Sequence, residues 1–113
     1  MGHKKKLLSH LADAATSFLA EVTTDPINEI RGHFTASIFR EWVKSNATGL
    51  PAAKCAASYD IDKKIVSVFL LTEDDQFIYT PAGKRVASVF SARSMDDEMR
   101  ELFKSDTMAL ILL

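Results

Sequence analysis

Three histidines and one cysteine are the side chains of this chain best suited to bind a metal ion or to act as a nucleophile: His3, His10, His33 and Cys55. No histidine stands at a metal-ligand spacing from the cysteine or from a pair of acids. A single cysteine can form neither an intramolecular disulfide nor a thiolate metal site. We therefore predict no metal site and expect Cys55 to be a small core or edge residue. If its thiol were exposed, the neighbouring Lys54 would lower its pKa.

The carboxylates and hydroxyls do not form a catalytic motif either. The acids cluster as Asp74-Asp75 in an expected turn and as Asp96-Asp97-Glu98 at an expected helix start, where turn chemistry and the helix dipole account for them. No Gly-x-Ser-x-Gly sequence is present, and Pro81-Ala82-Gly83-Lys84 has a single glycine where a phosphate-binding loop needs several. Because no nucleophile can be paired with a base, we predict no catalytic residues and a protein that is not an enzyme.

The overall charge and hydropathy restrict the classes of partner. The chain has 14 basic and 15 acidic residues and a net charge of −1, so no global field favours nucleic acid or an anionic membrane. No stretch approaches the ~20 apolar residues of a membrane span, and the basic start is not followed by a secretory apolar region. Length predicts a single domain over residues 1–113. With one cysteine and no such segment, we expect a cytoplasmic protein.

The first part of the chain, residues 5–46, is predicted to be helical. Over residues 5–24, apolar side chains recur at spacings of three and four. Asp25-Pro26 then supplies the N-cap and first position of a second helix, which runs to about Ser45 with Gly32 as its weakest point. The apolar stripe of this second helix consists of Ile27, Ile30, Phe34, Ile38 and Trp42.

Residues 50–113 have a mixed pattern that predicts an α+β part. The run Ile65–Leu71 is apolar on both parities, as in a strand covered on both faces, and Phe77-Ile78-Tyr79 is expected to pair with it as a hairpin. Val86, Val89 and Phe90 stand at helical spacing and predict a short helix. Ser94 is expected to cap another helix, which has Met99, Leu102 and Phe103 on its apolar face. The apolar segment 108–113 is expected to be a strand, a buried helix end or an interface.

Between about residues 39 and 103, a succession of apolar elements follows the order of a known family. Its parts are Trp42, Leu50-Pro51, Leu70-Leu71, Phe77-Ile78-Tyr79 and Ala82-Gly83, followed by Val86 and Phe90. In this succession the chain resembles the bacterial PAS-like family, in which the Ala-Gly pair opens a helix. The resemblance implies a small antiparallel sheet with short helices and a regulatory or sensory role in signalling.

The resemblance also implies an incomplete sheet, because only about ten residues follow Phe103. A full PAS fold closes its sheet with further long strands after the helical middle. We therefore expect an abbreviated PAS-like sheet. Either a terminal strand over residues 108–113 ends this reduced sheet, or a second subunit covers its open edge and apolar face, which makes a homodimer or a complex with a partner protein the expected state.

The resemblance and the apolar residues raise the question of a bound cofactor or a small ligand. PAS relatives sometimes hold haem through a helix histidine, which makes His33 the only haem candidate; a histidine at the solvent edge is the favoured interpretation. The Asn-Cys-Arg motif of flavin photosensors is absent around Cys55, so we predict no cofactor. A set of apolar residues would line a pocket for a small apolar ligand, or simply belong to the core: Phe34, Ile38, Trp42, Phe69 and Tyr79.

Our hypothesis is a non-catalytic regulatory, sensory or protein-interaction module that acts through dimerisation or partner binding. The alternative is a small nucleic-acid-binding transcriptional regulator, because two helices followed by a hairpin are typical of a winged helix. The second helix offers Arg31, Arg40 and Lys44 to a groove, against Glu29 and Glu41, so nucleic acid is the less favoured partner.

Overall fold

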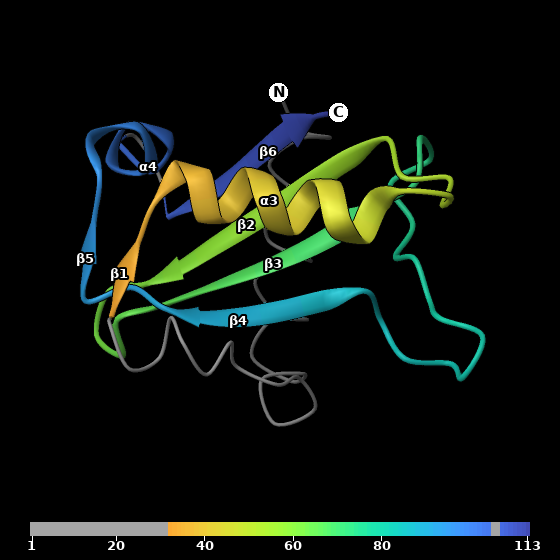
Figure 1. The fold of residues 1–113 in the computed structure, drawn as a ribbon, viewed down its shortest axis with the longest axis horizontal. Helices are drawn as coiled ribbons and strands as arrows, with labels where there is room; N and C mark the ends of the chain where they lie inside the picture. Colours follow the sequence, from red (N-terminus) through yellow and green to blue (C-terminus); the bar gives the residue numbers. More distant parts are fainter. Residues whose placement is uncertain (1–31, 105–106) are drawn as a thin grey trace.

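The computed structural model describes residues 32–104 and 107–113 (Figure 1). In chain order, the elements of these residues are β1 (His33–Phe34), α3 (Ala36–Ala47), β2 (Lys54–Asp60), β3 (Ile65–Leu71), β4 (Ala87–Ser91), β5 (Ser94–Met95), α4 (Asp97–Leu102) and β6 (Met108–Leu112). The predicted helix over residues 5–24 and the predicted start of the second helix at Asp25-Pro26 lie outside the described residues.

The fold is α+β, as predicted, and is built on an antiparallel sheet of four strands in the order β4-β3-β2-β6. Figure 1 shows α3 lying across one face of this sheet. In β3, Val66, Val68 and Leu70 belong to the cluster on the α3 side, whereas Phe69 and Leu71 belong to a second buried cluster. The prediction that Ile65–Leu71 is a strand with two apolar faces is therefore confirmed.

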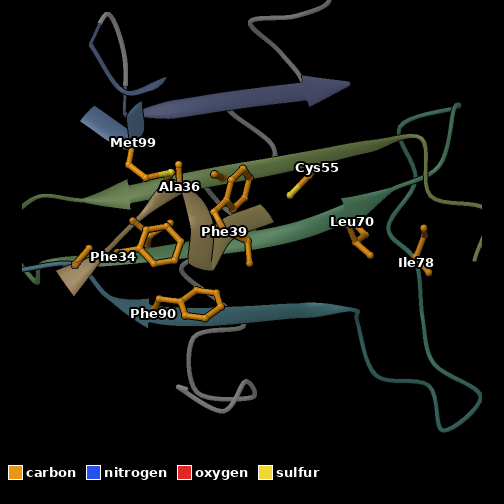
Figure 2. Packing of buried hydrophobic residues seen from close by; sticks show 12 residues of the cluster. Phe34, Ala36, Phe39, Cys55, Leu70, Ile78, Phe90 and Met99 are labelled. Carbon is orange, nitrogen blue, oxygen red and sulfur yellow. The ribbon is translucent and has the colours of Figure 1, made fainter. Parts of the chain in front are cut away.

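The main core lies between α3 and the sheet. Figure 2 shows the rings of Phe34, Phe39 and Phe90 together in this layer, with Met99 and Ile78 towards opposite ends of the cluster. The ring centroids of Phe34 and Phe90 are 4.9 Å apart, and those of Phe34 and Phe39 are 6.3 Å apart in an edge-to-face arrangement. Aromatic pairs in these geometries add to the free energy gained from burial alone.

The second helix is shorter than the predicted range of 26–45, because the chain is not helical at residues 32–35. Gly32 has a positive φ of 67°, and His33–Phe34 forms β1, which pairs in parallel with β5. The helix begins only after Thr35, whose Oγ1 accepts a hydrogen bond from the N–H of Ile38 at 3.2 Å. Phe34 thus reaches the core from a strand, and the predicted helical stripe was wrong at that position.

The hairpin partner of β3 is β2, which the sequence analysis did not predict as a strand. The register places Cys55 opposite Leu70 on one side and opposite Ile111 of β6 on the other. Phe77 and Tyr79 make only isolated bridges, to Leu71 and to Arg85 respectively. The prediction that residues 77–79 form the second strand of the hairpin was therefore wrong.

The short helix predicted around Val86, Val89 and Phe90 is also wrong, because residues 87–91 form β4. The side chains of β4 alternate between the two faces of the sheet, as in any strand. Ser88 and Phe90 lie on the α3 side, while Ala87 and Val89 lie on the other side. Ala82-Gly83, expected from the family pattern to open a helix, instead lies in a turn where Gly83 has a φ of 83°.

The last helix and the last strand agree with the sequence analysis in position. Helix α4 carries Met99 into the core, and the ring of Phe103 packs against Tyr59 with centroids 5.6 Å apart. Its N-cap is Asp96, however, and the predicted cap Ser94 lies in β5. Of the three alternatives for residues 108–113, the structure shows a strand, β6, paired with β2.

Candidate functional site

A groove of about 460 Å³ lies beside α3 at the side of the helix that faces β4. Its volume is within the range of sites that bind small molecules or single side chains of a partner. The lining residues are Ser37, Ile38, Glu41, Trp42, Ser45, Asn46 and Phe90. All except Phe90 come from α3, so one side of this helix forms most of the groove.

The amphipathic pattern of α3 explains why these residues share one side. Ala36 and Phe39 are the buried residues that face the sheet. Ile38, Trp42 and Ser45 follow one another at spacings of four and three, which places them in a row along the helix, next to the buried face. In this row Ile38 and Trp42 are half-buried and apolar, and Ser45 is exposed. Phe90 of β4 lines the same groove.

Trp42 is held in place by both its polar and its apolar atoms. Its indole Nε1–H donates a hydrogen bond to Ser88 Oγ at 2.9 Å, and its ring meets Phe90 edge-on, with centroids 6.4 Å apart at 88°. Asn46 Nδ2 donates to the carbonyl oxygen of Trp42 at 2.8 Å. The tryptophan thus joins the helix to edge strand β4, and its only donor is already used.

The charge of the groove comes from a single carboxylate. Among the seven lining residues, only Glu41 is charged. The preceding Arg40 points away to α4, where its Nη1 donates to Glu98 Oε2 at 2.6 Å. A groove with an apolar floor, hydroxyl and amide groups at its rim and one carboxylate favours an occupant that is apolar and neutral or cationic.

The structure brings together only two of the five residues predicted to line a pocket. Ile38 and Trp42 both lie in the groove. Phe34 is fully buried in the core beside it, Phe69 lies in the buried cluster on the opposite side of the sheet, and Tyr79 is 53% exposed. Thus no single cavity of the described residues is lined by all five.

The sequence analysis missed Phe90 and Ser88 as part of this site. Both lie in the region of the predicted short helix, and that prediction did not place Phe90 in contact with Trp42. The signal that would have found them is the alternation of Ser88 and Phe90 with Ala87 and Val89, which is the period of a strand.

His33, the haem candidate, lies on β1 and not on a helix as expected. Its side chain is exposed, and its Nδ1 is 2.7 Å from Ser94 Oγ, on the strand that pairs with β1. Among the described residues, no three His, Cys, Asp or Glu side chains gather closely enough to hold a metal ion. The geometry therefore adds no support for a cofactor at His33.

Cys55 is a core residue of β2. It is fully buried, and its Sγ lies 3.8 Å from the carbonyl oxygen of Ala56. Burial raises the pKa of the thiol to about 12, against a smaller opposing effect of a backbone hydrogen bond from Phe69. The ammonium group of the neighbouring Lys54 pairs with the carboxylate of Asp75 at the start of β2. The thiol is thus neutral and shielded.

Asp96 accepts hydrogen bonds from two backbone N–H groups that belong to different helices. It caps α4 by accepting from the N–H of Met99 at 3.0 Å, and it also accepts from the N–H of Ala36, the first residue of α3, at 3.1 and 3.2 Å. The bond from Met99 is the main reason that the pKa of Asp96 is lowered, and Ala36, His33 and Arg40 act in the same direction. The carboxylate therefore joins the N-termini of both described helices, as expected for an acid at a helix start.

Comparison with known proteins finds no matching family model, no matching curated protein and no matching solved structure. Within residues 32–104 and 107–113, neither helix has the length and apolar content required to cross a membrane.

Proposed function

We propose that the protein is a non-catalytic regulatory and interaction module of the PAS-like kind, which works in the cytoplasm by binding a partner protein in the α3–β4 groove. The observation that carries this proposal is the groove itself, which lies between helix α3 and strand β4 and has Ile38, Trp42 and Phe90 as its large apolar residues. A site of this shape holds one or a few side chains of a partner.

The occupant that fits best is a short segment of a partner protein with an apolar side chain next to a lysine or arginine. The apolar side chain would lie on Ile38, Trp42 and Phe90, the three large apolar residues of the groove. The neighbouring cation would lie close to Glu41, the one charged lining residue. Charge complementarity of this kind adds specificity to an apolar contact.

The signal would be a shift in population between two packings of α3. Trp42 connects α3 to β4 through Ser88, so an occupant that presses on the indole acts on both elements. Any difference in affinity for the two packings changes their ratio. The altered position of α3 would then be recognised by a second subunit or by a target protein.

A random heptapeptide phage library selected on the immobilised protein tests the proposal. We expect enriched peptides with an apolar residue next to Lys or Arg, and their binding to change the fluorescence of Trp42, the only tryptophan. Glu41→Lys should weaken these peptides about tenfold. The matched control Glu73→Lys makes the same charge change in an exposed turn and should leave affinity unchanged.

Two results would contradict the proposal. One is a library without a consensus, or with peptides that bind wild type and Glu41→Lys equally. The other is a native mass spectrum in which the purified protein retains a small apolar molecule that is lost in Ile38→Asp, because the groove would then be a small-ligand site.

The alternative hypothesis of a nucleic-acid-binding regulator depended on three basic residues. Of these, Arg31 lies outside the described residues, and the guanidinium group of Arg40 is paired with Glu98. A gel shift on mixed DNA at low salt separates the two hypotheses, since phosphate contacts weaken steeply as salt rises. A shift that disappears on adding salt would favour the alternative, and no shift at low salt eliminates it.

A further inference from the structure

Strand β6 has one edge that no described strand pairs with, because the order β4-β3-β2-β6 places it last. Its other edge is bonded to β2: Thr107 accepts from the N–H of Tyr59 at 2.8 Å, and the N–H of Leu113 donates to Ala53 at 2.9 Å. In an antiparallel ladder, alternate residues bond to opposite neighbours. The backbone groups that point away from β2 are therefore those of Met108, Leu110 and Leu112.

The sequence of β6 lacks the residue types that normally prevent an edge strand from pairing with other chains. The sequence of β6 is Met-Ala-Leu-Ile-Leu, without a charge or a proline. Leu112 is 76% exposed and the following Leu113 is 52% exposed. An apolar strand edge of this kind is a template for the addition of another strand.

We infer that β6 pairs antiparallel with β6 of a second copy of this chain, about a twofold axis at Leu110, so that the two four-stranded sheets become one continuous sheet. The occupant is a second copy because the edge complements itself. A twofold axis at Leu110 pairs that residue with its own copy and pairs Met108 with Leu112 of the partner subunit.

The register follows from counting the backbone groups that point outward. With the axis at Leu110, all three outward residues form hydrogen-bonded pairs, about six bonds in all. With the axis at Ala109 or Ile111, only two such pairs form within the strand, about four bonds. The axis at Leu110 thus uses every outward donor and acceptor of β6.

The side chains also agree with this pairing. Met108 and Leu110 belong to the cluster that includes Phe69, on the sheet face opposite α3. Residues paired across strands share a face, so the exposed Leu112 would lie against Met108 of the partner subunit. No charged side chain of β6 is brought near its own copy, because β6 has none.

This inference extends the dimerisation part of the proposed function, and it can succeed or fail independently of the groove. The groove lies at β4, the strand at the opposite edge of the sheet from β6. A single strand pair buries less surface than a standard interface, so we expect a dimer with a micromolar dissociation constant.

Disulfide trapping on the full chain tests the register. In a Cys55→Ala background, Leu110→Cys places two thiols opposite each other and should give a covalent dimer on mild oxidation. The matched control Leu112→Cys is at the more exposed position, but its thiols would be about four residues apart along the strands, which is too far for a disulfide. If disulfides formed by random collision of molecules, the more exposed thiol of Leu112→Cys would be oxidised to a dimer faster. Faster formation of the covalent dimer by Leu110→Cys would therefore indicate the proposed strand pairing.

Light scattering supplies a measurement that does not depend on added cysteines. The mass should rise with concentration from 12.5 kDa towards twice this value, and Leu112→Lys should weaken the dimer at least tenfold while the circular dichroism spectrum and groove peptide binding stay unchanged. A mass of 12.5 kDa at every concentration up to the millimolar range would overturn the inference. Trapping of Leu112→Cys as fast as Leu110→Cys would overturn the register.

Discussion

The reactivity of the Cys55 thiol tests how tightly β2 is packed between the strands β3 and β6 and under helix α3. Burial raises its pKa from the ordinary value of 9.0 to about 12. At pH 8 an exposed thiol with a pKa of 9.0 is about one-tenth thiolate, whereas Cys55 would be about one ten-thousandth thiolate. Since the thiolate is the reactive form, we expect native Cys55 to react with a thiol reagent at least a thousandfold more slowly than unfolded chain.

The assay follows the absorbance of released thionitrobenzoate at pH 8, in buffer and in guanidinium chloride. A control with the double change Cys55→Ala and Ser37→Cys carries its only thiol at an exposed position of α3 and should react quickly in both. In a series of urea concentrations, thiol reactivity and Trp42 fluorescence should change together, because both side chains belong to the same core.

Two observations would refute this reasoning. A native rate within tenfold of the unfolded rate would mean that Cys55 is not shielded as the structure places it. Thiol exposure at urea concentrations well below the fluorescence transition would mean that β6 separates from β2 while α3 stays packed, so that the sheet does not open as one unit.

Three further predictions concern helix ends, the groove and the backbone. Asp96→Asn keeps a good cap but loses the charge. Because the pKa of Asp96 is lowered, the stabilisation that its charge adds is present at neutral pH and is lost as the pH falls through the lowered pKa, so the thermal melts of the two proteins should differ at pH 6 and approach each other as the pH is lowered. Trp42→Phe and Ser88→Ala should show a coupling of about 1 kcal/mol in a double-mutant cycle of urea unfolding, and additive effects would argue against their hydrogen bond. Gly32→Ala should cost about 1–2 kcal/mol because of its positive φ. Gly49→Ala should cost less, because its Cβ meets nothing within 4 Å whereas that of residue 32 meets a side-chain carbon at 3.0 Å.

The elements predicted correctly are those whose local sequence pattern fits only one type of secondary structure. Ile65–Leu71 is a strand because its β-branched and aromatic residues are apolar on both parities. The apolar spacing of Ile38 and Trp42 favours a helix whatever lies opposite, and these are the two groove residues that the sequence identified. Within α3, they needed only the helical period to be placed together.

The elements missed are those whose local sequence pattern does not decide between types of secondary structure. Val86, Val89 and Phe90 suit the spacing of a helix, but pairing with β3 makes them part of a strand region. Lys54–Asp60 contains small residues with weak strand preference, yet it becomes the strand between β3 and β6. Local propensity is worth less than the hydrogen bonds and burial that such pairing adds.

By itself, the sequence determined the α+β class, the two-faced strand and most of α3. Only the tertiary structure decided that Phe90 meets Trp42, that Asp96 holds the ends of two helices, and that β6 comes last in the order of the described strands. The physical reason is the distance along the chain. Helical spacing acts between residues three or four apart, whereas Trp42 and Ser88 are brought together only when the sheet and α3 have closed on a common core.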